Sequence, residues 1–139
     1  MTPASRRLAG IILVVLPTVA FGGAALLTMI LGQQPGYLDN PLRQDLYRAG
    51  HAHAAVLLIL ALVILRYVDE ATLSGPWRFL ARDGVPIAAI LMSAGFFLSV
   101  LDPSATAPNG FINLVWVGAV FLVGGVLTTG VGLLRAPRS

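Results

Sequence analysis

The only two histidines of the chain lie close together, in the segment YRAGHAHA at residues 47–54. Neutral imidazole is a good ligand for copper, zinc or haem iron, and histidine also carries protons near neutral pH. A histidine near a membrane surface can also serve only to hydrogen-bond a backbone carbonyl or a lipid headgroup. The residue types therefore allow three roles for His51 and His53: a structural role, metal or haem binding, or proton and substrate handling.

The spacing of the two histidines limits which metal sites they can form. Residues i and i+2 of a helix point about 200° apart, so His51 and His53 cannot both bind one ion from a regular helix. A tetrahedral zinc site at either histidine would need further ligands. The nearest candidate oxygens are those of Asp102, expected at the same end of the molecule, and of Asp45.

A haem bound by one of these histidines would lack a second histidine within the chain. The iron would then be five-coordinate, or it would take a methionine such as Met92 or Met29. Further polar side chains are expected at the same level of the bundle. They form a candidate polar or substrate-binding cluster: Asp45, Tyr47, Arg48 and Asn113.

Several other chemistries find no support in the sequence. The chain has no cysteine, which excludes disulfides and thiolate metal sites. It contains no nucleophile elbow, phosphate-binding loop or carboxylate pair within an apolar segment. We therefore assign no catalytic residue and favour a function other than enzymatic catalysis.

The composition is that of an integral membrane protein. Hydrophobic residues make up 57% of the 139 residues and charged residues only 11%, whereas soluble domains carry roughly 25% charge. The nine basic residues are all arginine. They stand singly or in pairs at the ends of apolar segments, which is typical of membrane anchoring and does not indicate nucleic-acid binding.

Four apolar segments predict an all-α bundle of four membrane-spanning helices in a single domain. A span needs roughly 20 apolar residues. The expected spans are about 8–31, 41–67, 85–101 and 111–134, and a short interfacial helix is expected at about 75–83. Asn40 and Pro41 are typical of the first residues of a helix.

The arginines predict the orientation of this bundle. Seven lie before the first span, between the second and third, or after the fourth, including Arg138, whereas only Arg43 and Arg48 lie in the other two connections. By the positive-inside rule the arrangement is up-down-up-down with both termini in the cytoplasm. The expected location is the bacterial inner (plasma) membrane.

Small residues recur along several spans and predict close helix packing. Gly124, Thr128 and Gly132 are spaced by four residues in the fourth span, and Gly22 with Gly23 lies in the first. These stripes can join helices within one chain or between chains. The sequence thus leaves open a homo-oligomer or a place in a larger membrane complex.

The segment at residues 47–54 is similar to one in uncharacterised small four-span membrane proteins of bacteria. Its His-x-His entering an apolar helix also resembles segments of membrane proteins related to haem-copper oxidase subunit I. That resemblance covers about eight residues and implies a ligand role only for His51 and His53. The large oxidases use further histidines on other helices, which this chain lacks, so oxidase-type catalysis is not implied.

Together these patterns favour a small membrane protein that binds haem or a copper or zinc ion near its outer face through His51 or His53. Two alternatives remain: a non-catalytic accessory subunit of a larger membrane complex, and an oligomeric channel or carrier for small molecules.

Overall fold

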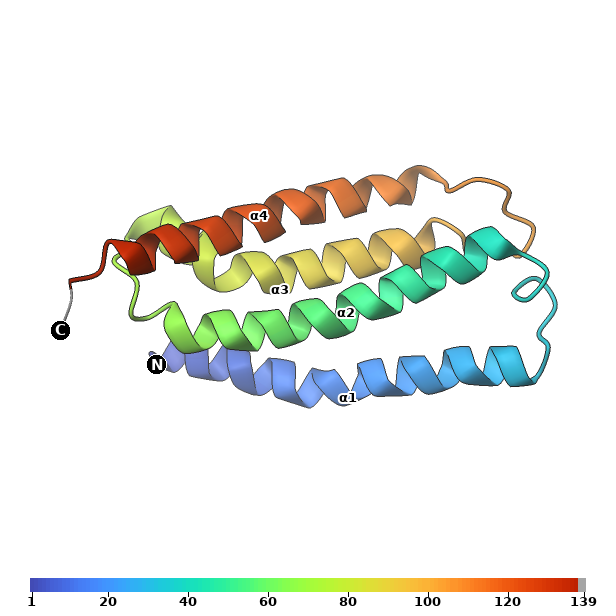
Figure 1. Ribbon diagram of the computed structural model, residues 1–139, viewed down its shortest axis with the longest axis horizontal. Helices are drawn as coiled ribbons and strands as arrows, with labels where there is room; N and C mark the ends of the chain where they lie inside the picture. The colour runs from blue at the N-terminus through green and yellow to red at the C-terminus, as the bar shows by residue number, and fades with distance from the viewer. Residues whose placement is uncertain (138–139) are drawn as a thin grey trace.

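The computed structural model describes residues 1–137, which are helical apart from their connections. Arg138, one of the arginines counted for the orientation, lies outside the described residues. The elements are four long helices and one short 3₁₀ turn: α1 (Pro3–Leu31), α2 (Pro41–Tyr67), α3 (Gly75–Leu98), η1 (Gly110–Ile112) and α4 (Asn113–Leu134). Successive long helices run in opposite directions, and the start of α1 and the end of α4 lie at the same end of the bundle (Figure 1). We call this the terminal end, and the opposite end the far end.

Two of the long helices begin with a side-chain cap, and the cap of α2 is the one that the sequence predicts. The Asn40 side chain accepts a hydrogen bond from the backbone N–H of Arg43, and Pro41 follows as the first residue of α2. The Thr2 side chain caps α1 in the same way, with the N–H of Ser5 as donor. A capped first turn leaves fewer unsatisfied N–H groups where the chain leaves the apolar layer.

The third helix differs from its prediction. A separate interfacial helix and a short span were expected, but α3 is continuous from Gly75 to Leu98 and includes Pro86. Its first turns are bent away from the remainder (Figure 1). Pro86 removes one N–H and crowds the carbonyl of Arg82, which bends a helix when neighbouring packing holds both halves. At about 1.5 Å per residue the continuous helix is long enough to cross a membrane.

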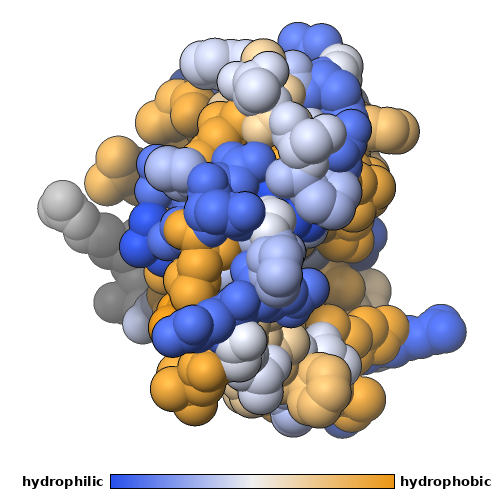
Figure 2. All heavy atoms as spheres, turned by 90° about the vertical axis from the view of Figure 1, so that its right-hand side faces the viewer, coloured by the Kyte–Doolittle hydropathy of each residue, from blue (hydrophilic) through white to orange (hydrophobic). Residues whose placement is uncertain are grey.

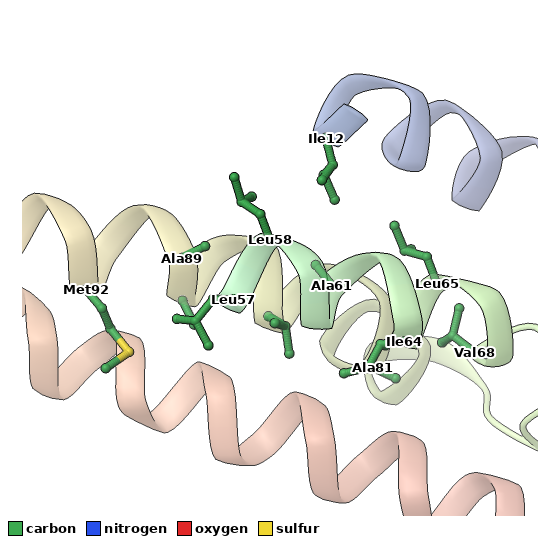
Figure 3. Packing of buried hydrophobic residues seen from close by; sticks show 12 residues of the cluster. Ile12, Leu57, Leu58, Ala61, Ile64, Leu65, Val68, Ala81, Ala89 and Met92 are labelled. Atoms are coloured by element: carbon green, nitrogen blue, oxygen red, sulfur yellow. The ribbon is translucent and has the colours of Figure 1, made fainter. Parts of the chain in front are cut away.

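The helices form a row rather than a closed square. α3 packs most extensively against α4 and then against α2, whereas α1 packs almost entirely against α2. In the apolar core, Ile12 points from α1 toward α2 between Leu58 and Leu65, and Met92 points from α3 toward α4 (Figure 3). The first helix therefore lies at one end of the row and is the least extensively packed of the four long helices.

The small-residue stripes join helices within the chain. A Cβ on Gly125 would lie 3.1 Å from the carbonyl oxygen of Leu80, and one on Gly118 would lie 3.1 Å from the backbone nitrogen of Met92. Both contacts bring the backbones of α3 and α4 close together, as small residues do where lipid supplies no hydrophobic drive. Small residues of the fourth span thus contact α3 within the chain.

Large apolar side chains cover the outer surface of the row. Val14 and Phe21 of α1 and Val120 of α4 are more than 70% exposed. All four long helices are long and apolar enough to cross a membrane. An apolar surface of this kind is suited to contact with lipid.

Candidate functional site

Hydrophilic side chains gather over the far end of the bundle, where two loops and the first turns of α2 meet, with apolar side chains around them (Figure 2). The loops are residues 32–40, between α1 and α2, and residues 99–109, between α3 and η1. Both predicted histidines lie on α2 below this polar cap, so the cap and the first part of α2 form the region to examine.

Arg43 is the polar centre of the cap. Arg43 as a whole residue is only 8% exposed. Nε donates to the carbonyl oxygen of Val100 at 2.9 Å, Nη1 donates to that of Gly36, and Nη2 donates to the Tyr47 hydroxyl at 2.8 Å. One guanidinium thus joins both far-end loops to α2.

Aromatic rings extend this cluster into the bundle. Tyr37 is 1% exposed, and its ring centroid lies 5.9 Å from that of Tyr47. Tyr47 in turn meets Phe97 of α3 edge-on at 5.4 Å. Gly36 has φ +73°, and a Cβ there would lie 2.7 Å from Pro103, so the turn that delivers Tyr37 requires glycine. We call Tyr37, Arg43, Tyr47 and Phe97 the Arg43 cluster.

His53 has one ring nitrogen engaged within its own helix. Nδ1 lies 2.7 Å from the carbonyl oxygen of Ala49. A carbonyl only accepts, so Nδ1 carries the proton, and in the neutral ring Nε2 carries the lone pair. The ring also lies against Phe96, with centroids 5.0 Å apart. These two contacts fix the orientation of the ring.

A shallow hollow of about 160 Å³ lies beside this ring on the surface of α2. It is lined by His53 with Ala52, Val56 and Leu57. Ala52 and Val56 are exposed, and the hollow is predominantly apolar. A flat ligand could approach the ring here from the side of the lipid.

His51 faces α1, whereas His53 faces α3. A Cβ placed on Gly23 of α1 would lie 3.0 Å from Nε2 of His51, and one on Gly22 would lie 3.7 Å from Nδ1. The imidazole therefore lies on the glycine pair of α1. His51 fills the space between α1 and α2, whereas His53 contacts α3, so the predicted divergence of the two side chains is present in the structure.

The other predicted ligands lie elsewhere. Asp102 is exposed in the loop after α3, where Ser104 donates to it from its hydroxyl and its backbone N–H at 2.7 and 2.8 Å. These hydrogen bonds and the charge of Arg43 hold the pKa of Asp102 below its usual value. Met92 lies in the core against Gly118 of α4, and Met29 lies near the end of α1.

The predicted polar cluster is divided among separate places. Asp45 and Arg48 form an exposed ion pair at 2.7 Å, of a kind that contributes little to stability. Tyr47 belongs to the Arg43 cluster. Asn113 is exposed at the first turn of α4 and donates to the carbonyl oxygen of Gly110.

Within residues 1–137 the structure places no three histidine or acidic side chains where they could hold one metal ion.

Sequence reasoning missed the roles of Arg43, Asn40 and Tyr37 in the cap. Arg43 was counted only as an orientation charge, and Asn40 only as a helix cap. Asn40 also donates from Nδ2 to the carbonyl oxygens of Pro103 and Ala105, at 3.1 and 2.9 Å. The one local signal was the four-residue spacing of Arg43 and Tyr47, which places them on one helix face.

No protein-family model, curated protein or solved structure matches the chain. The class therefore rests on the fold itself, which is that of a multi-pass helical membrane protein.

Proposed function

We propose that this membrane protein binds haem through Nε2 of His53, near the far end of the bundle. The observation that carries the proposal is the hydrogen bond between Nδ1 of His53 and the carbonyl oxygen of Ala49. Histidines that ligate metals donate their other ring N–H to a carbonyl or carboxylate, which fixes the tautomer and makes the free nitrogen more basic. His53 already has this arrangement.

A single imidazole is better suited to binding haem than to binding a bare metal ion. The porphyrin supplies four nitrogens to the iron, so one protein ligand is sufficient to hold it. Zinc instead requires three or four protein ligands, and Asp102 is turned toward Ser104. A copper or zinc ion at His53 would need ligands from a second chain.

The surroundings of His53 would place the macrocycle at the surface of α2. The hollow beside the ring is apolar and borders the exposed residues Ala52 and Val56. It is too small to enclose a porphyrin, so a bound haem would be covered on its outer side by lipid or by a second copy of the chain. A homo-oligomer would also offer a second axial histidine.

The orientation is part of the proposal. Arg6 and Arg7 lie at the terminal end, with Arg66, Arg78, Arg82 and Arg135. At the far end, Arg43 is bound to loop carbonyls and Arg48 to Asp45. The positive-inside rule then places both termini in the cytoplasm of a bacterium and His53 near the outer face of its plasma membrane.

The accessory-subunit alternative draws its support from α1. This helix packs almost entirely against α2, and large apolar side chains such as Val14 and Phe21 lie on its outward face. A larger membrane protein could cover that face. Strict co-purification with such a partner, together with absence of haem, would favour this alternative, and flux in liposomes would favour a channel or carrier.

The test is to purify the protein, His53→Ala and His51→Ala in detergent from the same host, and to measure iron, copper and zinc per chain with the absorption spectrum. We expect haem in the unmodified protein and in His51→Ala, and its loss in His53→Ala. His51→Ala is the matched control, since it removes an imidazole two residues away. Equal haem content in all three proteins would refute the assignment of His53.

A further inference from the structure

A second cavity lies at the terminal end, away from the histidines. It has a volume of about 400 Å³ and lies between the α2–α3 loop, the first turn of α3 and the last turns of α4. Four hydroxyl or charged side chains and four apolar ones line it: Thr72, Ser74, Thr128, Arg135, Leu73, Trp77, Leu127 and Val131.

The loop that forms one wall is held in place by α4. The backbone N–H of Thr72 donates to the carbonyl oxygen of Gly132 at 3.1 Å. A Cβ on Gly132 would lie 2.8 Å from the Leu73 side chain and 2.9 Å from that of Ala71. Glycine at this position therefore allows the loop to lie directly on α4, and the cavity is a built feature of the fold.

The cavity combines a positively charged rim with an apolar wall. Arg135 is exposed at the rim, and no ion pair within residues 1–137 includes it. Among the described residues, no carboxylate lines the cavity. Leu127 and Val131 lie one helical turn apart on the same face of α4, and Trp77 stands opposite them on α3.

The start of α3 adds to the positive potential. Ser74 makes no side-chain capping bond, and the first turn contains no acidic residue. The backbone N–H groups at a helix start carry a partial positive charge that favours a nearby anion. Arg78 adds a further positive charge, since its guanidinium donates two hydrogen bonds to the carbonyl oxygen of Leu73, a residue of the cavity wall.

We propose that this cavity binds an anionic phospholipid from the membrane leaflet at the terminal end. Its phosphate would pair with Arg135 and accept hydrogen bonds from Thr72 and Thr128. Its acyl chain would lie along Leu127 and Val131, with Trp77 at the boundary between headgroup and chain, where indole rings prefer to lie. Two observations within residues 1–137 select this ligand: the Arg135 guanidinium forms no ion pair beside an apolar groove, and no acidic group is in the lining.

The test uses Trp77 as its own reporter. In a Trp116→Phe background, the emission of Trp77 is followed in phosphatidylcholine nanodiscs as phosphatidylglycerol replaces part of the neutral lipid. We expect a saturable change in emission. A basic residue near a membrane surface contributes about fivefold in affinity for anionic lipid, so Arg135→Gln should need about five times more phosphatidylglycerol. Arg135→Lys should retain much of the affinity.

Arg7→Gln is the matched control, because Arg7 is an exposed arginine at the same end of the bundle that does not line the cavity. It should leave the midpoint of the Trp77 change in place. Equal shifts in Arg135→Gln and Arg7→Gln would overturn the proposal by showing general attraction to the charged surface. The same change with inorganic phosphate in neutral nanodiscs would overturn the lipid assignment in favour of a free-anion site. No change with either probe would refute the site.

Discussion

The guanidinium of Arg43 lies among carbonyl oxygens and against a tyrosine ring, and forms no ion pair within residues 1–137. Its Nη2 donates to the Tyr47 hydroxyl, and the guanidinium carbon lies 5.0 Å from the centre of that ring. The backbone carbonyls of the two far-end loops would otherwise face a partly apolar surrounding without donors, which is costly. One side chain thus fixes loops that are far apart in the sequence.

Replacement of Arg43 should therefore destabilise the protein strongly. We expect Arg43→Met to lower the free energy of unfolding by about 2–4 kcal/mol, since it removes several charge-assisted hydrogen bonds and leaves buried carbonyls unpaired. Arg48→Met is the control, because its ion pair is largely exposed, and it should cost less than about 1 kcal/mol. Equal losses for both variants in detergent unfolding experiments would contradict the role given to Arg43.

At the two histidines, helix geometry allowed the sequence to predict that the side chains diverge. It could not show what each ring would meet, because Gly23 and Phe96 belong to other helices. The same limit applies to Arg43, whose partners lie seven and 57 residues away in the chain. Contacts within one helical turn can be predicted from the spacing of residues in the sequence. Contacts between loops depend on the tertiary structure.

Among the elements, α1 depends on its seam with α2. A Cβ on Gly23 would approach the His51 ring to 3.0 Å, whereas one on Gly10 would meet nothing within 4 Å. We expect Gly23→Val to lower the free energy of unfolding by about 1–3 kcal/mol through overpacking. Gly10→Val should have little effect.

A double variant checks the cause of that loss. Because the clash is with the His51 ring, His51→Ala should restore part of the stability of Gly23→Val when the four proteins are compared as a cycle. Strictly additive effects would show that Gly23 acts through something other than this contact.

The start of α1 is tied to the α2–α3 loop by Asp69. Its carboxylate accepts from the backbone N–H and hydroxyl of Thr2, at 2.6 and 3.1 Å, and from the hydroxyl of Ser5 at 3.1 Å. Partial burial raises the pKa of Asp69, but these hydrogen bonds outweigh it, so the pKa lies below its ordinary value of 3.8.

This lowered pKa predicts how the anchor responds to acid. The stabilisation is fully present above the ordinary pKa and is lost as the pH falls through the lowered one. Hydrogen exchange in the first turns of α1 should therefore accelerate over that acidic range, corrected for intrinsic rates, and Asp69→Ala should be fast throughout. Glu70→Ala serves as control, because Glu70 forms only an exposed pair with Arg66. Unchanged protection in Asp69→Ala would contradict the anchor.

Most of the helices could be predicted from the sequence, but the continuity of α3 could not. Apolar length indicated the other long helices, and Asn40 with Pro41 indicated the start of α2, since both are local signals. The sequence predicted a separate interfacial helix followed by a short span, with the break ahead of Pro86. Packing of Gly84 against the carbonyl oxygen of Phe121 holds α3 to α4 just before this proline, so the helix bends and continues.

For the whole molecule, the central prediction is its orientation in the membrane. The chain has no cysteine, so single cysteines can report on each side. In intact cells, Ser104→Cys at the exposed far end should react with a membrane-impermeant maleimide, whereas Ala4→Cys at the terminal end should react only after the cells are opened. The reverse pattern would place the termini outside and His53 near the cytoplasmic face.

The most direct test of the account is a haem titration of the haem-free protein in nanodiscs, followed by the Soret band. The unmodified protein and His51→Ala should show a saturable shift to the spectrum of histidine-ligated haem. His53→Ala should show only the spectrum of haem partitioned into lipid, and added free imidazole should recover part of the shift. Identical titrations for His53→Ala and the unmodified protein would contradict ligation by Nε2 of His53.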